Sequence, residues 1–360
     1  MQPIERIYVA NLASNDISVI DAVANAVVAT VPVGSQPGGM AVSPDGSRLY
    51  VANAVSDSVS VIDTASNAVV TTITVGAGPR ANMVMTPDGT RIYVSNSGQN
   101  NNSVSVIDAA TNTVLVTVPV GETPGNMAIS RGGTRVYVAN NLGSSVSVID
   151  TTSNTVVATV GVGAAPAFLV SSPDGSRVYV GNRGDDVVSS SSLSVIDTAS
   201  NTVVDIVPLG MLGALDISGM VMTPDGTRIY LSGGNTSNSV FVIDTTRNEL
   251  LSVVPVGSDV GASPGDMVVS PDGLRVYVAN FFRQSVSVID TSILVEVAIV
   301  QVGLLPGGAL VMTPDGARMY VANVGGNSVS VIDTTSNTAV ATVAVGRSPR
   351  NSVLVRTAAY

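Results

Sequence analysis

The fold is decided by residues 38–76, which read GGMAVSPDG, SRLYVAN, AVS, DSVSVIDTASN and AVVTTITVG. Four of these pieces alternate apolar with small or polar residues, or are short β-branched runs, and this predicts four strands. The Ser-Pro-Asp-Gly segment at 43–46 suits a tight turn, because Pro presets φ, Asp accepts bonds from backbone amides and Gly adopts a positive φ. The segment 63–67 predicts a second turn, capped by its Asp and Asn side chains.

The same unit recurs along the chain. An Arg-x-Tyr motif marks its second strand at spacings of 42, 43, 44, 42, 51, 47 and 43 residues, and it begins at Arg6, Arg48, Arg91, Arg135, Arg177, Arg228, Arg275 and Arg318. A period in the forties, with turn signals about every ten residues, is typical of a β-propeller blade.

Counting each strand type gives eight blades. The N-terminus starts on a second strand and residues 351–356 supply a lone innermost strand, so the two chain ends share blade one as three strands plus one. This closure leaves no open edge. We expect one all-β domain over 1–360, with blades at 6–33 plus 351–356, 38–76, 81–120, 125–162, 167–209, 218–256, 265–302 and 308–345.

The Tyr-Val-Ala-Asn strand followed by Ser-Val-Ile-Asp-Thr resembles the YVTN-type β-propeller repeat of microbial cell-surface and envelope proteins. The resemblance extends over nearly the whole chain, although members of that family usually have seven blades. It implies a binding scaffold and a secreted or cell-envelope location. No signal peptide is expected in this chain, since its first residues lack a basic segment followed by an apolar one.

Composition restricts the chemistry. The chain has no Cys and no His, and all 16 of its basic residues are Arg, so thiolate, histidine and Schiff-base catalysis are excluded. No cofactor is predicted, because haem and catalytic-histidine propellers fit a chain without His poorly. The net charge of −10 argues against nucleic-acid binding, and no apolar run reaches the roughly 18 residues needed for membrane insertion.

The connections predict which face carries function. Loops after first and third strands are nearly invariant, and we name their side the regular face. Loops after second and fourth strands vary, and they form the variable face. Its longest segments are 181–192, 209–219 and 256–266. Binding residues usually lie on loops held by a rigid scaffold, so we expect a small molecule or a protein to bind the variable face and the mouth of its central channel.

Repeated polar residues receive a structural interpretation. The eight Arg of the Arg-x-Tyr motif and fourteen of the 22 Asp are expected to cap turns and to form ion pairs between blades on the regular face. Eight of the nine Tyr occupy the motif and are expected to pack between blades.

The irregular residues are the candidates for ligand binding. The candidates come from two places: the ring of positions just before the innermost strands, and the variable loops. Together they predict a site made from Arg80, Asn82, Glu122, Asn126, Phe168, Arg183, Phe281, Phe282, Arg283, Arg347, Arg350 and Asn351. Arginines here could hold an anionic group, or could instead pair with Asp16, Asp57 or Glu122. The Phe pair is either buried or an apolar lip for a ligand.

Carboxylates leave a second function open. If the protein is an enzyme, such as a hydrolase, lyase or cyclase, we expect Asp216 and Asp266 to be catalytic, because they lie on the two longest connections into the channel. With Glu122, or with the Asp185-Asp186 pair, they could ligate Ca²⁺, but no calcium-loop spacing is present and no metal site is assigned. An acid–base pair with a raised pKa would favour the enzyme. A featureless channel with an apolar patch at Phe281 and Phe282 would favour the scaffold.

Overall fold

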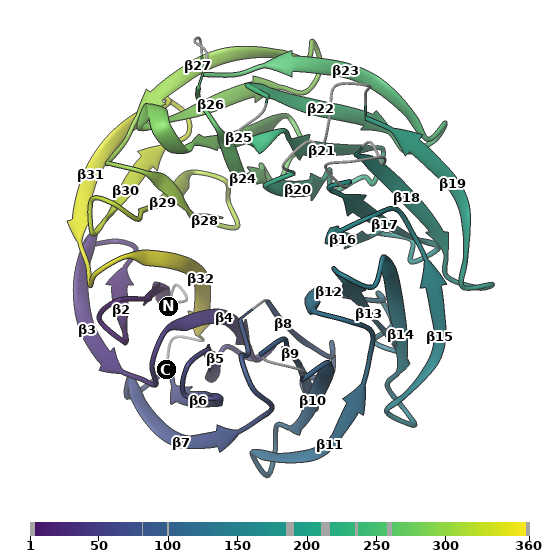
Figure 1. Ribbon diagram of the computed structural model, residues 1–360. Coiled ribbons are helices and arrows are strands. Elements are labelled where there is room, and N and C mark those ends of the chain that lie inside the picture. Colours follow the sequence, from purple (N-terminus) through teal and green to yellow (C-terminus); the bar gives the residue numbers. More distant parts are fainter. Residues whose placement is uncertain are drawn as a thin grey trace.

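The chain forms a ring of eight antiparallel sheets. The structure, a computed structural model, describes residues 4–80, 82–98, 101–184, 191–209, 217–234, 237–257 and 261–357. Each sheet has four strands in sequential order, except that the first joins β3, β2, β1 and β32. Figure 1 shows the sheets arranged around a central axis, with the innermost strand of each nearest to it. The predicted eight-bladed propeller is confirmed.

The two inner strands of each blade are its innermost strand, which lies nearest the central axis, and the second strand, which pairs with it. The innermost strands are β4 (Pro37–Val42), β8 (Met83–Met85), β12 (Pro124–Ile129), β16 (Pro166–Ser171), β20 (Gly219–Met222), β24 (Pro264–Val269), β28 (Pro306–Met312) and β32 (Pro349–Thr357). The second strands are β1 (Ile4–Asn11), β5 (Arg48–Asn53), β9 (Arg91–Asn96), β13 (Arg135–Asn140), β17 (Arg177–Asn182), β21 (Arg228–Ser232), β25 (Arg275–Asn280) and β29 (Arg318–Asn323).

The two outer strands complete each blade. The third strands are β2 (Asp16–Asp21), β6 (Ser58–Asp63), β10 (Ser103–Asp108), β14 (Ser145–Asp150), β18 (Ser192–Asp197), β22 (Ser239–Asp244), β26 (Ser285–Asp290) and β30 (Ser328–Asp333). The fourth strands are β3 (Ala26–Pro32), β7 (Ala68–Thr74), β11 (Thr113–Pro119), β15 (Thr155–Gly161), β19 (Thr202–Pro208), β23 (Glu249–Pro255), β27 (Val295–Gln301) and β31 (Thr338–Ala344). A short 3₁₀ helix, η2 (Phe281–Arg283), follows β25.

The ends of the chain close the ring. β32 pairs antiparallel with β1, so that Ile7 lies opposite Leu354 and Arg6 opposite Val355. Val355 is buried in the apolar cluster between blades one and two. The predicted three-plus-one closure of blade one is confirmed.

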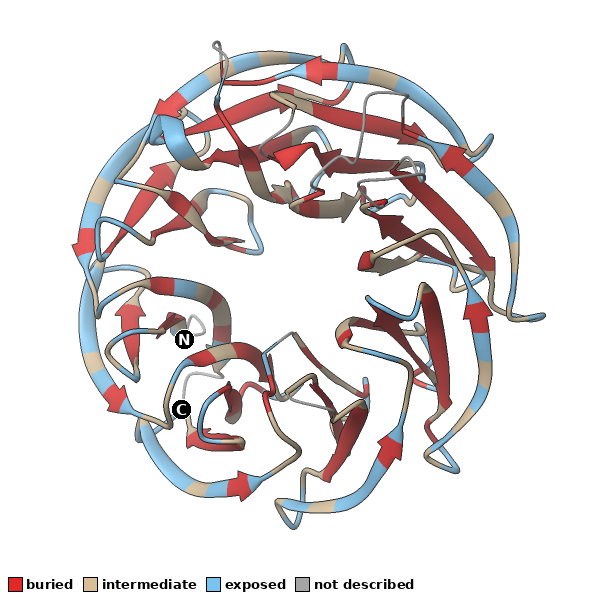
Figure 2. Cartoon of the chain, in the orientation of Figure 1, coloured by how far each residue is buried: buried red, intermediate tan, exposed pale blue. Residues whose placement is uncertain are grey.

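The hydrophobic core lies between neighbouring sheets. Figure 2 shows that second and third strands are mostly buried, whereas the outermost strands are largely exposed. Tyr8 and Ile17 of blade one share a buried cluster with Leu49 and Ile62 of blade two. Each blade therefore buries the apolar face of its neighbour.

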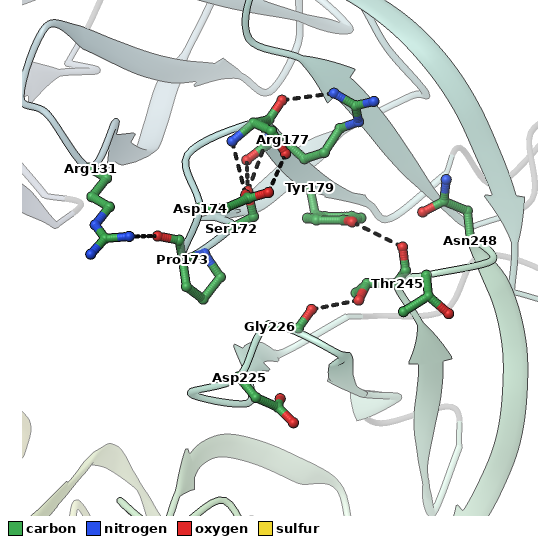
Figure 3. Close-up of a pocket in the computed structure, with 12 residues that line it drawn as sticks. Arg131, Ser172, Pro173, Asp174, Arg177, Tyr179, Asp225, Gly226, Thr245 and Asn248 are labelled. Atoms are coloured by element: carbon green, nitrogen blue, oxygen red, sulfur yellow. Dashed lines mark hydrogen bonds between the residues drawn. The ribbon is translucent and has the colours of Figure 1, made fainter.

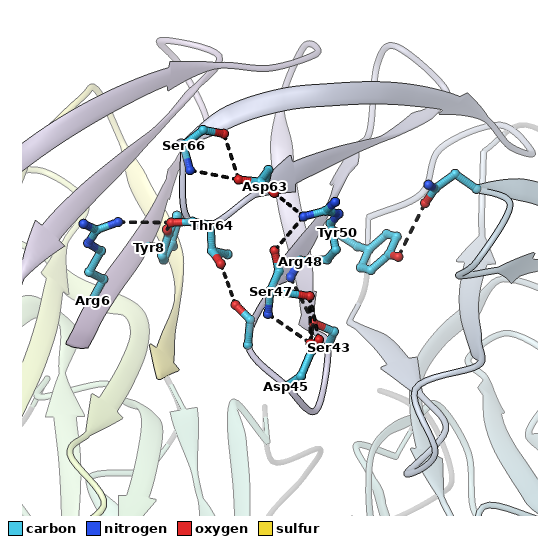
Figure 4. Close-up of polar contacts among 12 residues, drawn as sticks. Arg6, Tyr8, Ser43, Asp45, Ser47, Arg48, Tyr50, Asp63, Thr64 and Ser66 are labelled. Atoms are coloured by element: carbon cyan, nitrogen blue, oxygen red, sulfur yellow. Dashed lines mark hydrogen bonds and ion pairs between the residues drawn. The ribbon is translucent and has the colours of Figure 1, made fainter. Parts of the chain in front are cut away.

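Polar contacts on the regular face join one blade to the next (Figure 4). The Tyr8 hydroxyl donates to Asn67 Oδ1 at 2.7 Å, and Arg6 donates to the Thr64 carbonyl at 3.0 Å. The predicted packing of tyrosines between blades is confirmed. Turn capping is confirmed as well, since Asp45 accepts hydrogen bonds from the amide and hydroxyl of Ser47.

The predicted ion pairing between blades is wrong. The arginine–aspartate pairs of the motif join second and third strands of a single blade, because Arg and Asp lie opposite each other in the β-ladder. These pairs are Arg48–Asp63, Arg135–Asp150, Arg177–Asp197 and Arg275–Asp290. The arginines that reach a neighbouring blade do so by hydrogen bonds to backbone carbonyls, as Arg6 does to Thr64 and Arg91 to Thr151.

The turn after β26 breaks the pattern of the repeat. Seven equivalent turns place Asn in the left-handed region, as Asn67 does at φ 52°, whereas this turn places Leu294 there at φ 55°. A branched side chain in this region costs about 1–2 kcal/mol. Moreover, the buried hydroxyl of Tyr230 in the preceding blade has no hydrogen-bond partner. Leu294 packs against the cluster that contains Tyr230, whereas in three other turns the equivalent residue, Asn67, Asn112 or Asn154, accepts a bond from the tyrosine of the preceding blade.

We expect deletion of residues 349–360 to expose the edge of β1 and the apolar cluster around Val355. An unpaired strand edge promotes association between chains, so the truncated protein should melt at a lower temperature and should aggregate. Thermal denaturation and size-exclusion chromatography measure both effects. A monomeric protein with an unchanged melting temperature would contradict the role given to β32.

We expect Leu294→Asn to raise the free energy of unfolding by about 1 kcal/mol. Relief of the left-handed strain and a new acceptor for Tyr230 together exceed the lost packing of a half-buried Leu. Urea denaturation measures the change. Leu294→Ala is the control, since it loses the packing and gains neither benefit, and it should destabilise the protein. If both variants destabilise equally, the lost packing outweighs both benefits and this explanation is wrong.

Candidate functional site

A cavity of about 450 Å³ lies at the mouth of the central channel on the variable face. Blades five to eight and blade one contribute to it, through β16, β24, β28, β32 and the loops beside them. Six of the predicted site residues line this cavity: Phe168, Asp266, Phe281, Phe282, Arg350 and Asn351. The structure therefore brings together a large part of the predicted ligand-binding set and one of the two predicted catalytic carboxylates.

Phe281 and Phe282 form one wall of the cavity. Their amides donate to the carbonyls of Ser263 and Ala262, at 3.1 and 3.3 Å, so this segment is held by the connection that leads into β24. The two rings meet edge to face, with centroids 5.0 Å apart. Phe281 packs against Gly307, where any Cβ would collide with its ring, while Phe282 is 57% exposed. Phe282 is thus an exposed lip and Phe281 is its half-buried support.

Phe168 contributes a further aromatic ring to the cavity lining. It is half-buried in β16, and the Arg183 guanidinium lies 5.6 Å from its ring centroid, within the range of a cation–π contact. Arg183 also donates to the Ile217 carbonyl at 2.9 Å. Arg183 therefore fixes a cavity wall and does not itself line the cavity.

Four of the eight ring positions, Gly39, Asn126, Asp266 and Ala309, lie in irregular parts of innermost strands and not before them as predicted, whereas Asn82 precedes β8 as predicted. In β24 the ladder with β25 shifts register between Pro264 and Met267, which leaves Gly265 and Asp266 outside the regular pairing. A bulge of this kind redirects side chains. Asp266 Oδ1 accepts a bond from the Met267 amide at 3.0 Å, and Oδ2 accepts one from the Leu310 amide at 3.2 Å.

Asp266 is a carboxylate without a counter-ion among the described residues. It is half-buried in the cavity wall, and this burial raises its pKa to about 6, an effect larger than the opposing one of its two amide donors. Loss of hydration disfavours the charged form of a carboxyl group. Asp266 therefore changes its ionisation in a range where ordinary carboxyl groups stay charged.

Asn82 and Asn126 occupy the position of Asp266 in blades three and four, and the side chains of both form hydrogen bonds to the backbone of the next blade. Asn82 accepts a bond from the Met127 amide at 2.8 Å and donates to the Met127 carbonyl at 3.0 Å. Asn126 donates to the Ala167 carbonyl at 2.8 Å. These side chains join adjacent innermost strands, and neither lines the mouth cavity.

The predicted arginines do not all belong to the mouth cavity. Arg350 is exposed and lines the mouth cavity, whereas Arg80, Arg283 and Arg347 are exposed but do not line it. Arg347 donates to the Ala13 carbonyl at 3.2 Å. Arg80, Arg347 and Arg350 form no ion pair with the carboxylates proposed as alternatives, which are Asp16, Asp57 and Glu122.

The other predicted carboxylates do not add to the cavity. Glu122 is exposed and lies outside its lining. Asp185, Asp186 and Asp216 fall outside the described residues. In the part of the chain that the structure describes, acidic side chains nowhere gather in a group of three able to hold a metal ion. That same part contains no helix whose length and apolar character would let it cross a membrane.

Sequence reasoning missed cavities on the regular face. Three of them, of about 570, 450 and 590 Å³, share Arg131, which stands where other blades carry the Pro of the Pro-Asp-Gly turn. This replacement of Pro by Arg was the signal in the sequence that could have pointed to these cavities. In Figure 3 the Arg131 side chain donates to the Pro173 carbonyl, at 2.8 Å. The neighbouring Asp174 is a turn cap, and bonds from Ser172 and Ser176 lower its pKa to about 2. We favour the mouth cavity, because it alone among these is lined by phenylalanine rings.

Comparisons with known proteins agree with the fold. A sequence model of the YNCE-like β-propeller family matches residues 3–90. This match and the eight-bladed ring confirm the resemblance to YVTN-type propellers. No curated protein sequence matches the chain.

Several solved structures are similar to the ring. Kuenenia stuttgartiensis hydrazine synthase has 26% identity and a TM-score of 0.67, covering 83% of this chain and 95% of that one. Dihydro-heme d1 dehydrogenase NirN, in complex with DHE, has 18% identity and a TM-score of 0.78, covering 97% and 74%. Apo AztD from Citrobacter koseri has 16% identity and a TM-score of 0.71, covering 99% of both chains. The NirN and AztD structures show likeness of fold alone.

We expect Asp266→Asn to stabilise the protein at neutral pH and to have little effect at pH 4. The folded pKa of about 6 exceeds the unfolded value of 3.8, so the folded state binds more protons between these values and stability falls as pH rises through that window. Above pH 6 the ionised Asp266 costs about 1–3 kcal/mol, which the variant recovers. Urea denaturation of both proteins at pH 4 and pH 7.5 measures this. A difference between them that does not change with pH would contradict the raised pKa.

Proposed function

We propose that this chain is a propeller scaffold that binds a small amphipathic anion in the mouth cavity of the variable face. One observation carries the proposal: three of the four Phe in the protein line a single cavity with Arg350, a guanidinium without an ion-pair partner among the described residues. Apolar walls with a few charged groups are typical of ligand pockets, and about 450 Å³ lies in their usual range.

The proposal includes the location implied by the sequence resemblance, in the cell envelope or outside the cell. The absence of Cys is compatible with a location on either side of a membrane. The sequence assigns no metal site to the carboxylates of the variable loops and leaves open whether they bind a hard cation such as Ca²⁺.

An enzyme is the alternative, and Asp266 is the observation that favours it. Its pKa of about 6 suits a general acid or base near neutral pH. A hydrolase, lyase or cyclase would need a second group opposite it, and no other carboxylate among the described residues lines the cavity. Binding is therefore the better supported function.

The test uses 3-phenylpropionate, which joins one carboxylate to one phenyl ring. We expect Arg350→Ala to weaken its binding by about tenfold, the effect of losing one charge-assisted hydrogen bond. Phe282→Ala should also weaken binding, through lost apolar contact. Ligand-observed NMR titration at pH 7.5 gives the dissociation constants.

The matched control is Arg131→Ala, which removes an exposed arginine from the regular face. It should leave binding unchanged. If Arg131→Ala weakens binding as much as Arg350→Ala does, or if binding is absent in the parent protein, the mouth cavity is not the site.

A further inference from the structure

Asp266 is the only charged residue at the eight ring positions around the channel. The other seven positions hold Gly, Asn, Phe or Ala, and they are Gly39, Asn82, Asn126, Phe168, Gly219, Ala309 and Asn351. Three of the four polar side chains at these positions, those of Asn82, Asn126 and Asp266, join one innermost strand to the next. Asp266 does so by accepting a bond from the Leu310 amide, as Asn82 does from the Met127 amide.

An asparagine would join the strands at least as well. Asn82 both accepts from and donates to the neighbouring strand, while a carboxylate can only accept. The joining of strands therefore does not require the negative charge of Asp266, whose other oxygen serves only the adjacent Met267 amide, and burial of this charge without a counter-ion is unfavourable. A surplus charge at a cavity wall is explained when a ligand supplies the opposite charge.

We propose that the mouth cavity recognises a zwitterionic amphiphile, such as an amino acid with a large apolar side chain. The ligand's ammonium group binds Asp266, its carboxylate binds Arg350 and its apolar part contacts Phe281, Phe282 and Phe168. This inference rests on the proposed function, since it concerns the same cavity, and it adds the cationic half of the ligand.

The geometry favours an ammonium group over a metal ion. Each oxygen of Asp266 already accepts one backbone amide, which leaves lone pairs for donors such as N–H groups. A hard cation such as Ca²⁺ takes about six or more oxygen ligands, and Asp266 is the single carboxylate among the described residues of the cavity lining. The edge-to-face pair of Phe281 and Phe282 offers a π surface that also attracts an organic cation.

The experiment compares three probes that share a phenyl ring: L-phenylalanine with both charges, 3-phenylpropionate with the carboxylate alone and 2-phenylethylamine with the ammonium alone. NMR titration at pH 7.5 is made on the parent protein, Asp266→Asn and Arg350→Ala. In the parent protein, phenylalanine should bind about tenfold more tightly than either other probe. Asp266→Asn should remove its advantage over 3-phenylpropionate, and Arg350→Ala should remove its advantage over 2-phenylethylamine.

A pH series adds an independent readout. Between pH 7.5 and pH 5 the parent protein should lose most of its preference for phenylalanine over 3-phenylpropionate, because Asp266 becomes protonated; Arg350 is the other charged group in the lining. Asp266→Asn should show no such change. Its melting temperature, measured beside the titrations, should equal or exceed that of the parent protein at pH 7.5, which separates lost recognition from lost folding.

The outcomes distinguish the two proposals. If 3-phenylpropionate binds at Arg350 as tightly as phenylalanine and Asp266→Asn changes neither affinity, the zwitterion inference is overturned and the proposed function stands. If none of the three probes binds the parent protein, both are overturned.

Discussion

Each blade of this propeller depends on its two neighbours to cover its apolar faces. The second and third strands carry buried residues on both sides of the sheet, so no blade could stand alone in water. Tyr8 illustrates this arrangement, since its ring packs in the cluster shared with blade two and its hydroxyl donates to Asn67 of that blade. Only a closed ring satisfies this requirement for all eight blades.

The periodic part of the fold was predictable from the sequence because it obeys local rules. Alternating residues, Pro-Asp-Gly turns and Asn in left-handed turns each act over a few residues, and eight copies reinforce one another. The prediction that failed was the one that paired the motif arginines with aspartates of neighbouring blades. Whether Arg48 bonds to Asp63 of its own blade or to a neighbouring blade depends on register and side-chain reach, which no local pattern encodes.

The candidate site was predictable only in part, for a related reason. Phe281, Phe282 and Arg350 were noticed because they break the repeat, and irregularity marks what the scaffold does not require. The same reasoning placed Asn82 and Asn126 in the ligand-binding site, because they break the repeat. In the structure, however, they form hydrogen bonds between adjacent innermost strands. That reasoning also passed over Arg131, which replaces the Pro of a turn and lines three cavities on the other face. Residues that break the repeat are candidates for ligand binding. Their hydrogen-bond partners in the structure then show which of them serve the fold and which can contact a ligand.

Closure through β1 and β32 has a consequence for synthesis of the chain. The first three strands of blade one leave the ribosome well before the strand that completes their sheet, which ends at Thr357. Blades two to eight can assemble in order as they emerge, whereas blade one must wait for nearly the whole ring. During that interval the edge of β1 stays unpaired and open to association with other chains, and the ring becomes a finished structure only when its last strand arrives.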